Sequence, residues 1–181
     1  SGKMPAPARI MEEQIVGPSL GKESIRAGMY SFVAAFFAVL LYMLFFYSSK
    51  AGQAANIALL LNLFFLIGIL ASLGAVLTLP GIAGIVLTMG MAVDANVIIY
   101  ERIQEEHRAG KGLSLAISDG FKHAYSAIID GQATTFLTGV ILYFFGTGPI
   151  KGFATTLMVG IITSLFTSIF IPRMIFEWQM K

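Results

Sequence analysis

The chain has 181 residues, of which 56% are hydrophobic and only 12% are charged. A soluble domain carries about 25% charged residues, so this composition excludes an ordinary soluble protein. The absence of cysteine excludes disulfides and thiolate metal sites, two histidines are too few for most zinc or iron centres, and a net charge of +2 is too small to indicate nucleic-acid binding.

Residues 1–24 differ from the rest of the chain because they are polar and contain several prolines and glycines. Residues 9–16 could form one short strand, but a single strand cannot fold alone. The chain also starts without a signal peptide or an initiator methionine. We therefore interpret 1–24 as the remnant of an extracytoplasmic (periplasmic) domain, and the chain as a fragment of a longer protein.

The remaining residues, 25–181, have the pattern of a transmembrane domain. Four stretches contain no charged residue: 27–49, 51–93, 131–150 and 152–172. Because a helix needs about 20 apolar residues to cross the hydrocarbon core, they predict five spans near 26–48, 55–77, 81–101, 127–146 and 152–176. Pro80 and Gly81 supply the turn that divides the longest stretch, and Gly148 and Pro149 supply another.

Residues 102–126 carry many charges, and we expect them to form a loop in water. Apolar residues recur at helical spacing from Leu113 to Ile128, which predicts a short amphipathic helix at the membrane interface that leads into the fourth span. The expected fold is therefore all-α: a polytopic transmembrane helix bundle with one short interfacial helix.

The distribution of Lys and Arg predicts the orientation. Five spans place residue 50, the 102–126 loop and the C-terminus on one side, with seven basic residues against five on the other side. Since short cytoplasmic loops carry the excess of basic residues, the C-terminus should be cytoplasmic and the N-terminus extracytoplasmic.

Asp94 is the residue that stands out, because no other charged residue lies between Lys50 and Glu101. A carboxylate inside a span costs at least about 2.5 kcal/mol, so the neutral form should be easily reached. The functional reading is a group that takes up and releases protons; the structural reading is a protonated carboxyl bonded to a neighbouring helix. Gly90 and Glu101 share the helix face of Asp94, whereas Asn96 points elsewhere and is read as a helix–helix hydrogen-bonding group.

A second polar stripe opens the fourth span, where Asp130, Thr134 and Thr138 repeat every four residues and Gln132 and Thr135 lie between them. The hydroxyls either bond the carbonyls of their own helix or form a hydroxyl-and-water path beside Asp94. The glycines of the third span should allow close helix packing: Gly81, Gly84 and Gly90.

One long segment resembles a known signature. Residues 79–106, LPGIAGIVLTMGMAVDANVIIYERIQEE, resemble the SecD/SecDF protein-export family, which belongs to the resistance-nodulation-division superfamily. Further resemblance lies in VGPSLG at 16–21, DGQATT at 130–135 and GTGPIKGFA at 146–154. The family usually has Asn where Gln132 stands.

The resemblance implies a fold and a function. The chain would be half of a pseudo-symmetric bundle in the bacterial inner (cytoplasmic) membrane, and would use proton-motive force to assist export. Asp94 would load and unload protons, with Asp130, Thr134 and Thr135 as the polar motif on the next helix. The implied partners are SecF or the SecF half of a fused SecDF, which supplies a basic group, together with the SecYEG translocon, YajC and exported unfolded proteins. Protons are the coupling ion, and no cofactor is implied.

Three other functions remain open. The chain could belong to an exporter of small molecules or lipids of the same superfamily, or its helices could only anchor other subunits. An intramembrane aspartyl protease would need two carboxyls that share a proton, and the pairing of Asp94 with Asp130 is not evident. We expect a transport component and no enzyme.

Overall fold

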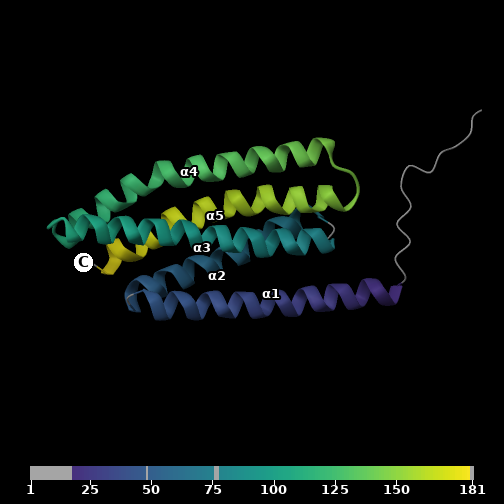
Figure 1. Ribbon diagram of the computed structural model, residues 1–181, viewed down its shortest axis with the longest axis horizontal. Helices are drawn as coiled ribbons and strands as arrows, with labels where there is room; N and C mark the ends of the chain where they lie inside the picture. Colours follow the sequence, from purple (N-terminus) through teal and green to yellow (C-terminus); the bar gives the residue numbers. More distant parts are fainter. Residues whose placement is uncertain (1–17, 48, 76–77, 180–181) are drawn as a thin grey trace, which may run out of the picture.

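The computed structural model describes residues 18–47, 49–75 and 78–179. Over these ranges the chain is all-helical and contains five helices: α1 (Pro18–Phe46), α2 (Ser49–Ser72), α3 (Leu79–Arg108), α4 (Leu113–Phe145) and α5 (Pro149–Gln179). Each is long and apolar enough to cross a membrane, which confirms the five predicted spans. The helices lie side by side along the long axis of the molecule (Figure 1). The strand predicted at 9–16 lies outside the described residues.

The helices are longer than the predicted spans, and the loop predicted at 102–126 is wrong in its extent. α3 continues to Arg108 and α4 begins at Leu113, so only 109–112 connect them. The charged residues at the end of α3 are compatible with a helix, since Arg102 and Glu105 form an i,i+3 ion pair of 2.7 Å. The break comes at Gly110, whose φ of 90° lies in the region that favours glycine.

The separate interfacial helix is also a wrong prediction, because its residues form the first half of the 33-residue helix α4. This half packs on α3. A Cβ atom on Gly120 would lie 2.8 Å from the Cα atom of Ile103, so only glycine permits this approach of the two backbones. Most of the apolar residues that predicted an amphipathic helix are buried in one cluster with Ile99 and Tyr100 of α3: Ile117, Phe121, Ala124 and Ile128. Leu113, at the start of the helix, is exposed.

The centre of the bundle is the contact between α3 and α5. Small residues bring these helices together, as predicted for Gly81 and Gly84: a Cβ atom on Gly84 would lie 3.3 Å from Thr156 of α5. On the other side of the contact, a Cβ atom on Gly160 would lie 2.6 Å from the Cβ atom of Thr88. Gly90 differs from the prediction, since it is exposed and no described atom lies within 4 Å of the position of a Cβ atom.

Of the two predicted turns, the one at Gly148 and Pro149 lies between helices as predicted, whereas Pro80 and Gly81 belong to the first turn of α3 and the connection from α2 precedes them. Thr78 is the N-cap of α3 and accepts a hydrogen bond of 3.1 Å from the Gly81 backbone, with Pro80 in the first turn. Between α4 and α5, Gly148 has a φ of 48°, and Pro149 starts α5. Both connections make the helices they join antiparallel neighbours.

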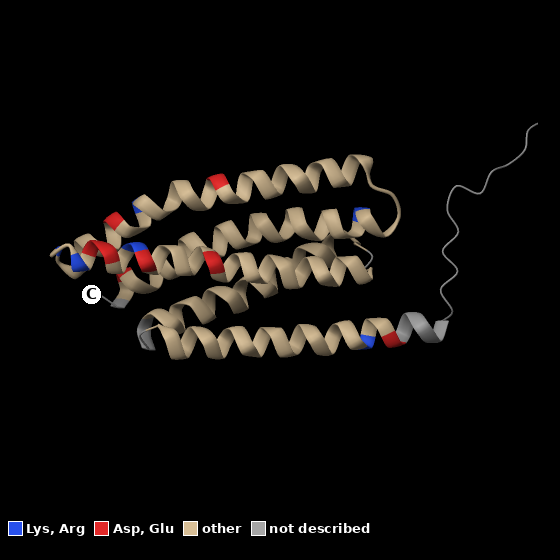
Figure 2. Cartoon of the chain, viewed as in Figure 1, with Lys and Arg blue, Asp and Glu red and all other residues tan. Residues whose placement is uncertain are grey.

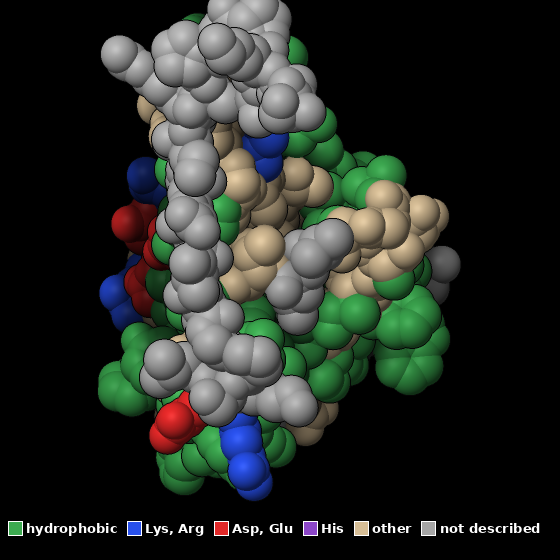
Figure 3. Space-filling model, turned by 90° about the vertical axis from the view of Figure 1, so that its right-hand side faces the viewer, with side chains coloured by type: hydrophobic (Ala, Val, Ile, Leu, Met, Phe, Trp, Pro, Cys, Tyr) green, Lys and Arg blue, Asp and Glu red, His purple; other side chains and the backbone are tan. Residues whose placement is uncertain are grey.

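Charged side chains gather at one end of the bundle, where α3 meets α4; we call this the charged end (Figure 2). It holds ion pairs among Arg102, Glu105, Glu106, Lys111 and Asp119. Where grey atoms leave the opposite end in view, Figure 3 shows mostly hydrophobic and uncharged side chains with few charged ones. α1 is the least buried helix and exposes large apolar side chains such as Phe37 and Phe45. Such a surface is compatible with contact to lipid.

Candidate functional site

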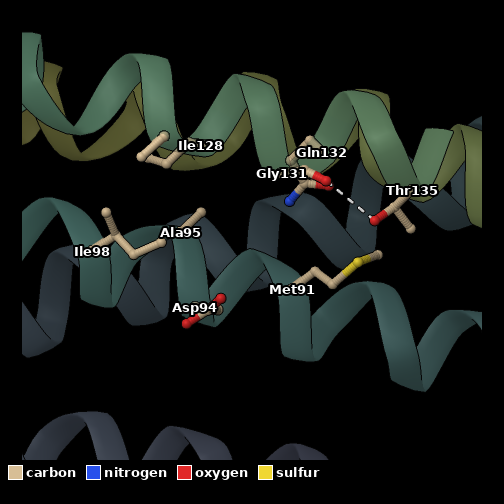
Figure 4. Close-up of a pocket in the computed structure, with 9 residues that line it drawn as sticks. Met91, Asp94, Ala95, Ile98, Ile128, Gly131, Gln132 and Thr135 are labelled. Atoms are coloured by element: carbon tan, nitrogen blue, oxygen red, sulfur yellow. Dashed lines mark hydrogen bonds between the residues drawn. The ribbon is translucent and has the colours of Figure 1, made fainter. Parts of the chain in front are cut away.

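Asp94 lies near the middle of α3 and is exposed on the surface of the described bundle. Its carboxylate has no hydrogen-bond or ion-pair partner among the described residues. It lines an open groove of about 210 Å³ between α3 and α4, which we call the Asp94 groove (Figure 4). On α3, Met91 and Ile98 flank the carboxylate at i−3 and i+4, as helical geometry requires for one face.

α4 forms the opposite wall of the Asp94 groove. Its polar contribution comes from Gln132 and Thr135, with Ile128 and Gly131 beside them (Figure 4). Gln132 is 93% buried and its Oε1 atom has no partner among the described residues, whereas the Thr135 hydroxyl donates a 3.2 Å hydrogen bond to the Gly131 carbonyl. An unpaired carboxyl, an unpaired amide oxygen and a hydroxyl therefore meet at one groove.

Two residues predicted to support Asp94 are not part of this groove. Asp130 and Thr134 lie on an exposed side of α4 outside the groove lining. The Thr134 hydroxyl donates to the Asp130 carbonyl at 2.8 Å, and the Thr138 hydroxyl donates to the Thr134 carbonyl at 3.1 Å. These hydroxyls therefore bond carbonyls of their own helix. The alternative of a hydroxyl-and-water path beside Asp94 stays a prediction.

The remaining polar residues predicted on α3 also have other surroundings. Asn96 is buried within the bundle, but its Oδ1 atom has no partner among the described residues, so the predicted interhelical bond by this atom is not formed. Glu101 is exposed and accepts a hydrogen bond of 3.5 Å from the Tyr47 hydroxyl. The pKa of Tyr47 is raised above its ordinary value, first because the phenol is partly removed from water and then because of the negative charge of Glu101.

The apolar residues that line the groove were not predicted from the sequence. Met91 and Ile98 read as ordinary apolar residues of a span; only their spacing of three and four residues from Asp94 could have indicated them. The sequence also did not identify Gly131 and Ile128 as groove residues, because no local pattern shows which face of the fourth span meets the third.

The charged end fixes the connection between α3 and α4. Lys111 bridges Glu106 at 2.6 Å and Asp119 at 2.5 Å, and Glu106 also contacts the His123 ring at 2.8 Å. Hydrogen bonds to Asp119 and Glu106 raise the pKa of Lys111 above its usual range. This cluster therefore ties the 109–112 connection to both helices at one edge of the membrane-spanning bundle.

The side chains that line the Asp94 groove can exchange a proton and form hydrogen bonds. Asp94 and Asp130 are not brought together in it, so the geometry lacks the shared-proton pair of an aspartyl protease. Within the described part of the chain there is no group of three or more side chains suited to hold a metal ion.

Comparisons with known proteins agree with this architecture. The family model "Protein export membrane protein SecD/SecF, C-terminal" matches residues 3–181. The "Protein translocase subunit SecD" of Rhodothermus marinus is 57% identical over 178 residues, which cover 98% of this chain and 28% of that protein. The protein of the same name from Koribacter versatilis is 51% identical over 177 residues, covering 98% of this chain and 33% of that protein.

Solved structures are similar as well. The crystal structure of SecDF from Thermus thermophilus, described as a translocon-associated membrane protein, matches with a TM-score of 0.86 and 42% identity, covering 90% of this chain and 23% of that chain. SecDF in a super-membrane-facing form matches with a TM-score of 0.84. The chain thus spans about a third or less of the length of these relatives. It is a multi-pass membrane protein, and it belongs to the SecD/SecF family of protein-export membrane proteins.

Proposed function

We propose that this chain is the membrane-embedded part of a SecD-type subunit that uses proton-motive force to assist protein export, with Asp94 as its proton-binding group. The observation that carries the proposal is the Asp94 carboxylate, which lies on a membrane-spanning helix without a partner among the described residues. Intramembrane ionisable residues are costly and mark ion or proton pathways. The relatives named protein translocase subunits supply the link to export.

The proposed cycle rests on the two charge states of one carboxyl. A carboxylate facing hydrocarbon costs about 2.5–3.5 kcal/mol on insertion scales, while the neutral acid costs less. A proton shifts a two-state bundle only if its affinity for Asp94 differs between the two states. The Asp94 groove offers such a difference, since access of water or of a positive group to the groove would favour the ionised form.

The exposed face of α3 fits a second helical bundle as partner. The five helices correspond to only 23% of the matched SecDF chain, so most of that assembly lies beyond this chain. We propose that the SecF half packs over the Asp94 groove and places a basic side chain near Asp94. That contact would remove Asp94 from lipid and would make its charge dependent on how the two halves are arranged.

The proposed setting is the bacterial inner membrane, with the charged end in the cytoplasm. This end carries most of the described basic residues: Arg102, Arg108, Lys111, Lys122 and Arg173. The excess of Lys and Arg in cytoplasmic loops supports this orientation. By the family resemblance, the partners are the SecYEG translocon, YajC and exported unfolded proteins. The other candidate, export of small molecules or lipids, has less support because the relatives are named for protein translocation.

The test is Asp94→Asn in the full-length protein together with its SecF partner. Asparagine has the size of aspartate but cannot release a proton, so export of a secreted protein from energised vesicles should fall to the rate that remains after an uncoupler is added. Asp94→Glu should retain part of the proton-dependent rate.

The matched control is Asp130→Asn, which removes an exposed carboxyl from α4 outside the groove. It should leave more of the proton-driven rate than Asp94→Asn does. Undiminished, uncoupler-sensitive export by Asp94→Asn would refute the role of Asp94 and would favour helices that merely anchor other subunits.

A further inference from the structure

α3 carries a buried stripe on the side away from Asp94, with members every four residues: Thr88, Ala92, Asn96 and Tyr100. Residues four apart share a helix face, and Asn96 lies about 200° around the helix from Asp94. Both ends of the stripe meet α5. A Cβ atom on Gly160 would lie 2.6 Å from that of Thr88, and the rings of Tyr100 and Phe176 are 5.9 Å apart. Asn96, between these contacts, therefore faces α5.

α2 adds a second amide to the same interior. Asn62 has no exposed surface. Three residues further along, the Phe65 ring lies 5.9 Å from Phe166 of α5, and four residues further along, Leu66 packs with Ile85 of α3. Because Asn62 lies between these two directions on the helix, it faces the junction of α2, α3 and α5.

The polar atoms of these side chains are unpaired. Neither Nδ2 nor Oδ1 of Asn62, nor Oδ1 of Asn96, nor the hydroxyl of Tyr100 has a partner among the described residues, and all of these atoms are buried. A side-chain amide offers two donors and one acceptor. Buried polar atoms are nearly always bonded to protein or to internal water, because an unpaired one loses its hydration without replacement.

α5 supplies further acceptors along the same interior. Ser164, Thr167 and Ser168 are buried, and each hydroxyl donates to a carbonyl of its own helix, for example Ser168 to Ser164 at 2.6 Å. Their oxygen atoms still have lone pairs that can accept a hydrogen bond.

We propose that internal water molecules occupy this seam between α2, α3 and α5 and connect it to the charged end. The polar file consists of Asn62, Asn96, Tyr100, Ser164, Thr167 and Ser168. It opens at a cavity of about 240 Å³ that Tyr100 shares with Gln104 and His107 of the charged end. Water in the file would bond the unpaired amide atoms and the hydroxyl oxygens, which supply the two to four partners that a buried water needs.

The polar file is distinct from the Asp94 groove, because the two lie on different faces of α3. It gives water a route from the charged end to Asn62 in the bundle interior. The proposal does not depend on proton binding by Asp94, since it concerns only which buried positions water reaches.

Cysteine accessibility tests the file, and this chain has no cysteine of its own. Ser164→Cys is nearly isosteric and keeps both amides, and Ala154→Cys is the matched control because Ala154 is equally buried on α5 near the other end. Both are made in the full-length protein on a background without other cysteines. Membranes are treated with a small methanethiosulfonate reagent, which reacts with thiolate and therefore needs water at the sulfur.

We expect Ser164→Cys to react at least about tenfold faster than Ala154→Cys, because apolar burial suppresses the thiolate. Adding Asn96→Leu, which fills the file with an apolar side chain, should remove this advantage. Three results would overturn the proposal: no reaction at either cysteine, equal reaction at both, or reaction of Ser164→Cys that Asn96→Leu leaves unchanged. Loss of proton-driven export in Asp94→Asn would affect none of these rates.

Discussion

Gly160 offers a sharp test of how α3 and α5 pack. Gly160→Ala adds one methyl group, whose carbon would lie 2.6 Å from the Cβ atom and 2.7 Å from the Oγ1 atom of Thr88. Ordinary carbon contacts are about 3.5–4.0 Å, so the helices would have to separate by about 1 Å. Both partners lie on helices, and Thr88 is fully buried, so neither can turn away. Overpacking of this kind costs about 1–3 kcal/mol.

The assay is the thermal unfolding of the purified full-length protein, compared with Gly90→Ala. Nothing described lies within 4 Å of a Cβ atom at Gly90, so this control should be neutral or stabilising by up to about 1 kcal/mol, as alanine favours helix over glycine. Thr88→Ala should partly rescue Gly160→Ala, because it removes the Oγ1 and Cγ2 atoms. If Gly160→Ala unfolds no earlier than Gly90→Ala, the reasoning about this contact is refuted.

Three further predictions concern the ends of the helices. Thr78→Ala should lower the free energy of unfolding by about 1 kcal/mol, because it removes the side-chain acceptor of the Gly81 N–H. Thr78→Ser keeps a hydroxyl at this position and should retain most of the wild-type stability, and chemical denaturation measures the difference between the two variants. Lys111→Met should slightly lower the unfolding temperature at low salt, because it removes two partly exposed ion pairs. The difference from the wild type should vanish near 1 M salt, where the screening length is about 3 Å. The raised pKa of Tyr47 favours the neutral phenol in the folded state, so stability should decline as the pH rises above the ordinary value of 10.0, and Tyr47→Phe should reduce this decline in a pH series of thermal unfolding.

The number of helices follows from local sequence, but the position of the connection between α2 and α3 does not. α2 already ends at Ser72, and Pro80 lies in the first turn of α3, where its missing N–H removes no helical hydrogen bond. The extent of the loop at 102–126 was misjudged because its charged residues were assigned to a loop in water. Arg102 and Glu105 instead pair on the helix surface, and the chain turns only at Gly110.

The candidate site was only partly predictable, because the side of a helix that meets its neighbour is set by tertiary contacts. A charge in an apolar stretch identifies Asp94 from sequence alone. Nothing local distinguishes Gln132 and Thr135, which reach the Asp94 groove, from Asp130 and Thr134, which do not. Which residues of α4 line the groove depends on how α4 is rotated about its axis relative to α3. The close approach of Gly120 to Ile103 helps to set that rotation.

The burial of Asn62 could not be predicted from the sequence, for a different reason. An amide carries no charge, and it lies in a long apolar stretch whose hydropathy already predicts a span. Its environment becomes visible only when α2, α3 and α5 close around it and leave both of its polar atoms without a described partner. The signal that could have found it is a polar side chain in the apolar middle of a helix, where small or polar residues mark contacts with other helices.

α3 is therefore a helix with two polar faces in different surroundings. The face with Asn96 is buried by other helices of this chain, while the face with Asp94 is exposed on the surface of the described bundle. A change of charge at Asp94 acts first on that open face, because no described residue of the chain bonds its carboxylate. The close contacts at Gly84 and Gly160 join α3 to α5, so α3 cannot respond alone without breaking them. In the proposed cycle, α3 and α5 should therefore move as one body against the SecF partner, and proton binding at Asp94 should change the contact between that partner and α3.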